Sequence, residues 1–402
     1  MACYSTSTCI SAWHPRSRRD LLPRAMSHIE VVYQASCPET DPEALAEAIA
    51  REQSLEILPE LIPADIARDF LGQVIDVRQL DARRWSLTIA YPDHLASAQL
   101  GQLLHLLYGN VSFYPRIRLV DLKLPDSLLD QFPGPLGGIP AVRSHVGIDD
   151  RALLLSVLKP RGSTPEFLAE LAFRFASGGG DILKDDQNLV ESDLRAFKTR
   201  VQACAEAVDR AAQASGRRCL YLPHVAGSGS HLQRQLDAVR RMELAGVVFC
   251  PWVMGLELTA TAARQHELMW LAHPAMAGAL TQPGETGIAP ELIFGTLSRL
   301  AGADLVIYPG CGGRISTGGA KTAEHIHHAL LIEQARHRAS LPCSGGGKTL
   351  SDLASIQARH GRDCAIVVGG DLLRHGPAIP EQVRQAIKGL AELNTEQTGL
   401  SR

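Results

Sequence analysis

The chain has 402 residues, of which 45% are hydrophobic, 21% are charged and 5% are aromatic, and its formal net charge is −3. These proportions are typical of a globular protein and exclude a disordered, collagen-like or coiled-coil chain. The near-neutral charge and the scarcity of aromatic rings argue against a nucleic-acid partner, which is bound by basic surfaces and stacking side chains.

The cysteine pattern and the lengths of the apolar runs indicate the compartment. Nine cysteines are widely spaced and include no CxxC pair, so neither a disulfide framework nor a structural zinc site is expected. The apolar runs fall short of the roughly 18 consecutive residues that a membrane-spanning helix needs. We therefore expect a cytoplasmic protein without a membrane partner.

Residues 1–27 are expected to lie outside the folded domains. They are rich in Ser and Arg and lack the hydrophobic region of a secretory signal, although a transit peptide has a similar composition. Met26 directly precedes the first strand-like run. We therefore interpret this segment as a disordered tail or as the product of a mis-assigned start.

Residues 28–147 are interpreted as an N-terminal α+β domain of the ferredoxin-like kind. Asp41 is well placed to cap the first of two helical patterns. A Pro/Gly-rich connector at 132–140 marks the change to a different pattern. Alternating strand-like runs cover residues 29–35, 86–92 and 117–124, and helical spacing covers residues 41–52 and 96–107.

Residues 148–402 are predicted to form an α/β domain, a (β/α)8 TIM barrel. Eight short apolar runs are separated by helical segments, and runs without alternation suit parallel strands that are buried on both faces. A doubly wound open sheet is the alternative, but it usually has fewer strands, and no GxGxxG motif follows the first run. The runs cover residues 153–159, 181–184, 219–224, 246–250, 268–273, 304–309, 340–345 and 364–370.

Polar residues fall where these predicted strands end, which is where a barrel carries its chemistry. Lys159 ends the first strand and His273 ends the fifth. The seventh strand runs into the SGGG sequence at 344–347, and the eighth runs into Gly369 and Gly370. Because glycine backbones let a phosphate approach closely, these two adjacent loops predict a phosphate site.

The second strand ends in the sequence KDDQ, which indicates a site for a hard cation such as Mg²⁺. Asp186 supplies a carboxylate, whereas Asp185 should face the opposite side of the strand and be structural. Lys184 is unable to bind a metal as an ammonium ion. It becomes an oxygen ligand only when its charge is removed, for example by carbamylation.

From about residue 28 onward, the chain resembles the large subunit of ribulose-bisphosphate carboxylase and its relatives. In this chain, the segment GGGDILKDDQNL is similar to the metal-site signature of that family. The segment LLLSVLKPRG is similar to the family's first barrel strand, which carries a catalytic lysine. The ordered motifs GNVSFYPRIRLVDLKLP, FPGPLGGI, RLAGADLVIYPG, LPCSGGG and IVVGG carry the resemblance through the rest of the chain.

The resemblance implies a role for each matching residue. Lys159 would handle the proton, His273 would contact substrate hydroxyls, and Lys184, carbamylated, would bind Mg²⁺ together with Asp186 and Gln187. Glu52 and Asn110 would reach the active site of a neighbouring subunit, which implies a homodimer with sites at its interface. The phosphate of the substrate would be held by Ser344, Gly345, Gly346, Gly369 and Gly370, and Arg314 is a candidate for binding a carboxylate or a phosphate.

Departures from the family pattern argue against CO₂ fixation. Gln187 replaces the third metal carboxylate by a neutral amide, which would weaken Mg²⁺ binding. The loop after the sixth strand lacks the lysine that stabilises the carboxylation intermediate, and Arg314 and Lys321 are poor positional substitutes. Pro274 follows the histidine of the fifth strand, where carboxylases have arginine.

This pattern resembles the form IV, RuBisCO-like members of the family in their non-photosynthetic branch. The resemblance implies an Mg²⁺-dependent lyase, hydrolase or isomerase that forms an enolate from a phosphorylated sugar. We expect decarboxylation or C–C cleavage of a sugar acid such as 3-oxo-isoapionate 4-phosphate. The alternatives are 5-methylthioribulose-1-phosphate isomerase, the diketo-methylthiopentyl-phosphate enolase of methionine salvage, and a catalytically decayed barrel that only binds or regulates.

Overall fold

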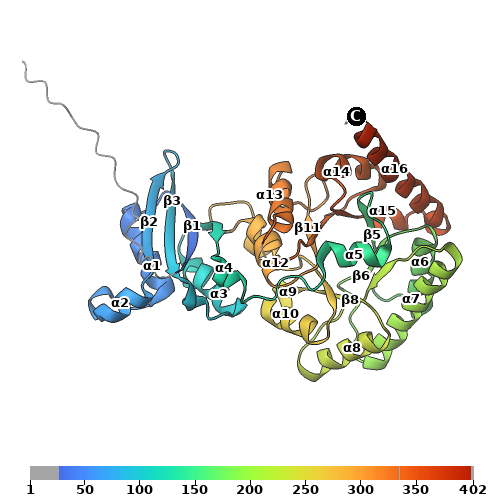
Figure 1. The fold of residues 1–402 in the computed structure, drawn as a ribbon, viewed down its shortest axis with the longest axis horizontal. Helices are drawn as coiled ribbons and strands as arrows, with labels where there is room; N and C mark the ends of the chain where they lie inside the picture. Colours follow the sequence, from blue (N-terminus) through green and yellow to red (C-terminus); the bar gives the residue numbers. More distant parts are fainter. Residues whose placement is uncertain (1–26, 335, 400–402) are drawn as a thin grey trace, which may run out of the picture.

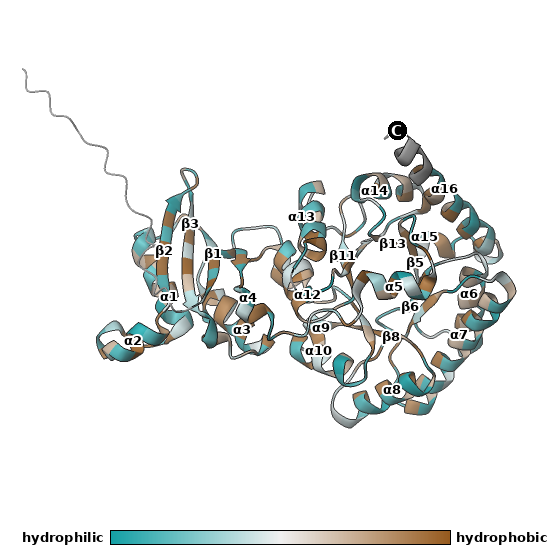
Figure 2. Ribbon diagram, viewed as in Figure 1, coloured by the Kyte–Doolittle hydropathy of each residue, from teal (hydrophilic) through white to brown (hydrophobic). Residues whose placement is uncertain are grey.

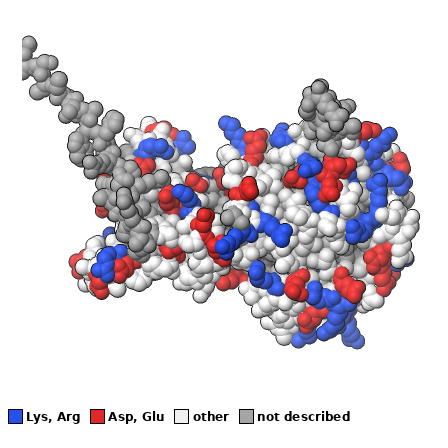
Figure 3. Space-filling view, viewed as in Figure 1, with Lys and Arg blue, Asp and Glu red and all other residues white. Residues whose placement is uncertain are grey.

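The structure is a computed structural model that describes residues 27–334 and 336–399. The expectation for the N-terminal tail therefore concerns residues outside the described part, apart from Ser27. Figure 1 shows an elongated molecule in which a smaller N-terminal domain lies beside a larger barrel. Charged side chains of both signs are interspersed over the face shown in Figure 3.

The N-terminal domain has the βαββαβ order of a ferredoxin-like fold, as predicted. Its sheet has the order β10-β4-β1-β3-β2, and β1 pairs antiparallel with both β3 and β4. The strands are β1 (His28–Ser36), β2 (Gln73–Gln79), β3 (Arg84–Pro92) and β4 (Ile117–Lys123). The helices and short turns are α1 (Pro42–Ser54), η2 (Pro59–Leu61), α2 (Ala64–Phe70), η3 (Asp93–Ala96), α3 (Leu100–Tyr108), η4 (Asn110–Phe113) and α4 (Asp126–Leu129).

Local predictions in this domain were mostly correct. The carboxylate of Asp41 accepts hydrogen bonds from the backbone N–H groups of Glu43 and Ala44, which confirms it as the N-cap of α1. The helix predicted from residue 96 is wrong at its start, because Ser97 and Ala98 adopt positive φ angles of 49° and 53° and α3 begins only at Leu100. Strand β2 was missed because this edge strand is largely exposed and carries little hydrophobic alternation.

The second domain is a closed barrel of eight parallel strands, which confirms the eight predicted runs. The first strand pairs with the last, β5 with β13, and a bridge between His224 and Val248 joins the ends of the strand order. This closure rules out the open doubly wound sheet. The strands are β5 (Leu153–Leu158), β6 (Ile182–Asp185), β7 (Leu220–Leu222), β8 (Gly246–Phe249), β9 (Met269–Ala272), β11 (Leu305–Pro309), β12 (Leu341–Gly345) and β13 (Ala365–Val367).

Helices surround the barrel and carry both hydrophobic and hydrophilic residues, as Figure 2 shows. Helix α8, for example, buries Leu232, Leu236 and Val239. The longer helices are α6 (Pro165–Ser177), α7 (Leu194–Ser215), α8 (Gly229–Arg241), α10 (Leu256–Gln265), α13 (Ala320–Leu331), α14 (Leu353–His360) and α16 (Ile379–Gly399). The shorter elements are α9 (Pro251–Met254), α11 (Gly278–Thr281), β10 (Gly287–Ile288), η5 (Glu291–Leu297), α12 (Ser298–Leu300), η6 (Leu350–Asp352), α15 (Gly370–Leu373) and η7 (Gly376–Ala378).

Helix α5 (Gly138–Val146) closes one end of the barrel. Its Ile139, Val142 and Val146 belong to the same buried cluster as the inward-facing strand residues. The Arg143 guanidinium bonds to Asp363 at 2.9 Å, just before β13 begins. This helix therefore packs over the N-terminal ends of the strands.

A two-residue strand ties the domains together. β10 comes from the barrel domain yet pairs in parallel with β4 at the edge of the N-terminal sheet. Arg118 of β4 donates hydrogen bonds of 2.9 to 3.1 Å to the carbonyls of Gln282, Thr286 and Ile288. Within the described residues, no helix combines the length and the apolar character needed to span a membrane.

Candidate active site

A cavity of about 920 Å³ opens at the carboxyl ends of the barrel strands. Residues from the ends of β5, β6, β9, β11, β12 and β13 line it, so it lies at the end of the barrel opposite α5. Of the candidates predicted from sequence, the cavity lining includes Lys159, Lys184, Asp186, Gln187, His273, Arg314, Gly345, Gly346, Gly369 and Gly370.

Lys159 and Asp186 form an ion pair at the cavity wall. The Lys159 Nζ lies 2.9 Å from Asp186 Oδ2, and the lysine side chain is 43% exposed whereas the carboxylate is 6% exposed. Asp186 also accepts two hydrogen bonds of 2.9 Å from Asn188. Burial opposes ionisation of Asp186, but the hydrogen bond from Lys159 and the other contacts hold its pKa below the ordinary value.

Lys184 is almost completely buried beside this pair. Its Nζ donates a 2.8 Å hydrogen bond to the Asp185 carbonyl, and no carboxylate lies within ion-pair distance among the described residues. Burial lowers the pKa of Lys184 to about 8, although the charges of Asp186 and Asp185 act in the opposite direction. A neutral amine is therefore accessible near neutral pH, and that is the form that reacts with CO₂.

Asp185 faces away from the cavity, as predicted. Its carboxylate is fully buried and accepts hydrogen bonds from the Tyr221 hydroxyl at 2.8 Å and the His224 backbone N–H at 3.0 Å. The Arg200 guanidinium pairs with the same carboxylate and also with Glu191. This network fixes β6 against β7 and α7, and so holds Lys184 and Asp186 in place.

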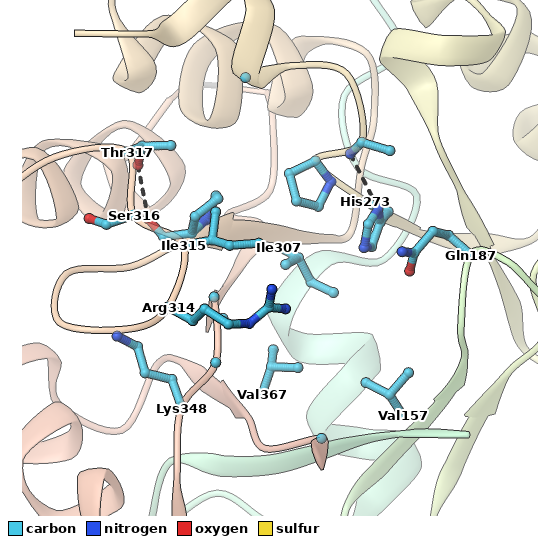
Figure 4. Close-up of a pocket in the computed structure, with 18 of the residues that line it drawn as sticks. Val157, Gln187, His273, Ile307, Arg314, Ile315, Ser316, Thr317, Lys348 and Val367 are labelled. Carbon is cyan, nitrogen blue, oxygen red and sulfur yellow. Dashed lines mark hydrogen bonds between the residues drawn. The ribbon is translucent and has the colours of Figure 1, made fainter. Parts of the chain in front are cut away.

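His273 and Gln187 lie beside each other on one wall of the cavity (Figure 4). The backbone N–H of Ala275 donates a 3.2 Å hydrogen bond to Nδ1 of His273. This bond requires the tautomer that carries its proton on Nε2. Burial, with a further contribution from the charge of Lys184, places the pKa of His273 well below its ordinary value. A neutral imidazole therefore faces the cavity at neutral pH.

The glycine turns after β12 and β13 line the cavity between the ends of β11 and β5. Added Cβ atoms would meet nothing within 4 Å at Gly370, and at Gly369 the nearest atom would be a Val157 carbon 3.8 Å away. Gly346 adopts a φ of +94°, a conformation that favours glycine. The predicted role of Ser344 fits less well, because Cys343 faces the barrel interior, and alternation turns the Ser344 side chain away from the cavity lining.

The loop after β11 lies over the turn after β12. The Ile315 N–H donates to the Gly346 carbonyl at 2.9 Å, and the Gly310 N–H donates to the Gly345 carbonyl at 3.1 Å. Lys348, which was missed as a site residue, also lines the cavity and donates from its Nζ to the Cys311 carbonyl. Its position directly after the SGGG sequence is the feature of the sequence that could have identified Lys348 as a site residue.

Glu52 and Asn110 pair with each other outside this chain's own cavity lining. The Asn110 Nδ2 donates a 2.9 Å hydrogen bond to Glu52 Oε1 within the N-terminal domain. Neither residue lines the cavity of the same chain. The structure thus brings the two predicted residues together but leaves them outside the barrel mouth.

The oxygen donors at the end of β6 suit a hard cation only when Lys184 carries a carbamate. Within the described residues, no group of three or more His, Cys, Asp and Glu side chains is placed to hold a metal ion. Asp186 contributes a carboxylate and Gln187 an amide oxygen, and a carbamate on Lys184 would complete a set of oxygen donors of the kind Mg²⁺ prefers. The residues therefore fit Mg²⁺ when Lys184 is carbamylated.

A ferredoxin-like domain joined to a (β/α)8 barrel, with lysines and glycine turns at the strand ends, defines the RuBisCO fold class. The sequence profile of the ribulose bisphosphate carboxylase large chain, catalytic domain, matches residues 138–354, and that of its N-terminal domain matches residues 19–128. The chain belongs to the ribulose bisphosphate carboxylase large chain family.

Individual relatives place the chain among the RuBisCO-like proteins of this family. It is 37% identical over 355 residues to ribulose bisphosphate carboxylase-like protein 1 of Rhodopseudomonas palustris, covering 88% of this chain and 95% of the relative. It is 32% identical over 376 residues to 5-methylthioribulose-1-phosphate isomerase of Rhodospirillum rubrum, covering 93% and 99% of the two chains. A crystal structure of a Rubisco-like protein from Rhodopseudomonas palustris matches with a TM-score of 0.82 at 31% identity, covering 91% and 98%.

Proposed function

We propose that this protein is an enzyme that forms an enolate from a phosphorylated sugar acid and does not fix CO₂. The reaction is decarboxylation or C–C cleavage of a compound such as 3-oxo-isoapionate 4-phosphate. The observation that carries the proposal is that the ion pair of Lys159 with Asp186, the buried Lys184 and the glycine turns all line one cavity. A cavity that combines acid–base groups with an anion cradle suits a phosphorylated substrate.

Lys159 is the residue to which we assign proton transfer. Its side chain is 43% exposed, and its Nζ lines the cavity at the end of β5. The partner carboxylate is largely buried, so the lysine is the member of the pair that a substrate carbon reaches. A positioned group of this kind contributes about 10²- to 10⁴-fold to the rate of a proton transfer.

Lys184, Asp186 and Gln187 would hold Mg²⁺. When bound, the ion stabilises negative charge on a substrate oxygen next to the reacting carbon. Carbamylation joins the neutral Lys184 amine to the carbon of CO₂, forming an N–C bond and releasing one proton. The pKa of about 8 leaves enough neutral amine for this step near neutral pH.

The loop after β11 supports a reaction other than carboxylation. The cation that this loop extends over the cavity is Arg314, in place of the lysine of carboxylases. Lys321 lies in α13 and is not part of the cavity lining. Gln187 further removes one negative charge from the metal site.

We also propose a homodimer in which the N-terminal domain of one subunit closes the cavity of the other. The Glu52–Asn110 pair leaves its own cavity untouched. Phe113, close to Asn110, is 88% exposed, and Met276 at the rim of the cavity is 65% exposed. Exposed apolar side chains on both domains are the expected partners in such an interface.

A second candidate is isomerisation of 5-methylthioribulose 1-phosphate. The relative of that name is similar over nearly the whole chain. Phe294, Pro283 and Met276 line one side of the cavity and offer an apolar surface for a thioether group. This reaction would use the same proton transfer by Lys159.

Deuterium exchange tests the proposal. Phosphorylated ketoses and keto acids are incubated with the protein, Mg²⁺ and bicarbonate in D₂O, and exchange next to the carbonyl or loss of CO₂ is followed by NMR. Lys159→Met should lower the exchange rate at least 100-fold and change ligand affinity by less than threefold. Full exchange in Lys159→Met would refute the assignment, and no turnover of any substrate by the native protein would favour the decayed barrel.

A further inference from the structure

One wall of the cavity is built from a segment with little secondary structure of its own. This segment follows β9 and covers residues 274–288, where it contains only the short helix α11 and the two-residue strand β10. We call its cavity-lining part, residues 276–283, the β9 wall. The lining residues of the β9 wall are Met276, Gly278, Ala279, Thr281, Gln282 and Pro283.

The β9 wall faces Lys159 across the mouth of the barrel. Three strands separate β9 from β5 in either direction around the closed sheet. Lys159 directly follows β5 and the β9 wall follows β9, so they come from opposite points of the ring of strand ends. Both line the same cavity, and a substrate in it is therefore held between Lys159 and this wall.

The N-terminal domain of the same chain holds this wall in place. The side-chain hydrogen bonds that reach residues 282–288 from elsewhere in the described chain all come from that domain. Most of them come from Arg118 of β4. Its guanidinium donates to the carbonyls of Gln282 at 2.9 Å, Thr286 at 3.0 Å and Ile288 at 3.1 Å. Because Gln282 lines the cavity, one side chain joins the N-terminal sheet directly to the β9 wall.

The hydroxyl of Tyr108, in α3, strengthens the same connection. It accepts a 2.8 Å hydrogen bond from the Gly287 N–H and donates a 2.9 Å bond to the Ile117 carbonyl of β4. Gly287 has a φ of +114°, and a Cβ at this position would lie 2.5 Å from the carbonyl oxygen of Leu280. The loop that Tyr108 binds is therefore folded tightly against the β9 wall.

The chemistry of arginine suits this task. A guanidinium presents five N–H donors in a planar fork and serves several carbonyls at once, whereas a lysine ammonium is a compact point charge. Among the described residues, no carboxylate lies within ion-pair distance of Arg118, so its donors are used on the carbonyls of the loop.

We infer that Arg118 is a positioning residue that sets the distance between the β9 wall and Lys159, and so determines how closely a substrate is held to the proton-transfer group. This inference rests on the proposed function, which assigns proton transfer to Lys159. A displacement of about 1 Å at the reacting atom can lower a rate by about 100-fold. Arg118 therefore influences the reaction although it does not line the cavity itself.

Two ligands of different length test this inference without turnover. Inorganic phosphate needs only the glycine turns, whereas erythritol 4-phosphate carries a four-carbon chain that extends into the rest of the cavity. Both are titrated calorimetrically into the full chain with Mg²⁺ and bicarbonate. Arg118→Gln should leave the affinity for inorganic phosphate within about threefold of the native value and lower that for erythritol 4-phosphate at least about tenfold. Equal loss of both affinities, or no loss of either, would overturn the inference.

Amide hydrogen exchange, followed by mass spectrometry, reports whether the wall has moved. Exchange across residues 282–288 should rise at least about tenfold in Arg118→Gln and stay unchanged in the barrel strands, and unchanged exchange in this loop would overturn the inference. Tyr108→Phe removes one hydroxyl and keeps the ring, and it should change exchange and affinity in the same direction. Arg116→Gln is the matched control, because Arg116 directly precedes β4 and pairs with Glu39 at the surface. This control loses the same charge and should match the native protein.

The reaction provides a separate readout. Arg118→Gln should lower the rate of substrate deuterium exchange at saturation by about 10- to 100-fold, and Arg118→Lys should not restore it, because an ammonium lacks the fork. A native protein that shows the expected ligand pattern but exchanges no deuterium would remove the proposed function and leave the positioning role standing. Deuterium exchange at the native rate in Arg118→Gln would overturn the inference and leave the proposed function intact.

Discussion

Gly346→Ala is expected to open the loop that covers the cavity. Gly346 has a φ of +94°, and a Cβ at this position would collide with the carbonyl oxygen of Ile315. The same two residues are joined by the 2.9 Å hydrogen bond from the Ile315 N–H to the Gly346 carbonyl. The substitution therefore strains the turn and separates it from the loop at once.

The expected loss of ligand affinity follows from the strain at Gly346 and from the lost hydrogen bond to Ile315. A side chain in the left-handed region costs about 1–2 kcal/mol, and loss of the hydrogen bond costs about 1 kcal/mol. If the free protein relieves this strain by opening the loop, a phosphate ligand must restore the closed turn when it binds. We therefore expect phosphate-ligand affinity to fall by roughly 30- to 150-fold.

Calorimetric titration with erythritol 4-phosphate measures the affinity, and the rate of tryptic cleavage after Arg314 reports opening of the loop. Gly361→Ala is the control, because Gly361 has a φ of +72° and a Cβ there would meet nothing within 4 Å. This control should lose stability and keep both affinity and protection. Affinity within threefold of the native value in Gly346→Ala, with unchanged cleavage, would refute the coupling of turn and loop.

Three further predictions concern the metal site and its support. Gln187→Glu should tighten Mg²⁺ binding at least tenfold in equilibrium dialysis with bicarbonate, because it adds a charged oxygen donor, and unchanged affinity would place the metal elsewhere. Carbamylation of Lys184, followed by ¹³C NMR with labelled bicarbonate, should rise with pH around a midpoint of about 8, since the ammonium form below this pKa cannot attack CO₂; a signal that persists in Lys184→Arg would contradict this. Arg200→Met should cost about 3–5 kcal/mol in denaturant unfolding, because it leaves the Asp185 carboxylate buried without its cation, whereas the exposed Arg195→Met should have little effect.

Much of the fold was determined by the local pattern of the sequence. Strands buried on both faces must be apolar throughout, so the eight runs of the barrel were readable one at a time. Since parallel strands present their carboxyl ends on the same side, the residues that follow them were expected to meet, and Lys159, Asp186 and the glycine turns do line one cavity. Strand alternation likewise predicted that Asp185 would point away from it.

Other features depended on contacts between distant segments, which local periodicity does not encode. Strand β2 is held by pairing with β3 and not by its own hydrophobic pattern. The partner of Asp186 is Lys159 from a different strand, and not its sequence neighbour Lys184. Lys348 meets the loop after β11 only because the chain folds back over β12.

The sequence by itself thus determined the order of the elements and the residues that gather at the barrel mouth. Each buried strand is visible as its own apolar run, and the residue that ends a parallel strand is known from that run alone. The tertiary structure alone decided which of those residues pair and which remain free. Lys159 is paired with Asp186 and Lys348 is bonded to a carbonyl, whereas Arg314 lines the cavity without an ion-pair partner among the residues that the structure describes. Electrostatic partners depend on distances across the fold, and those distances are set by packing.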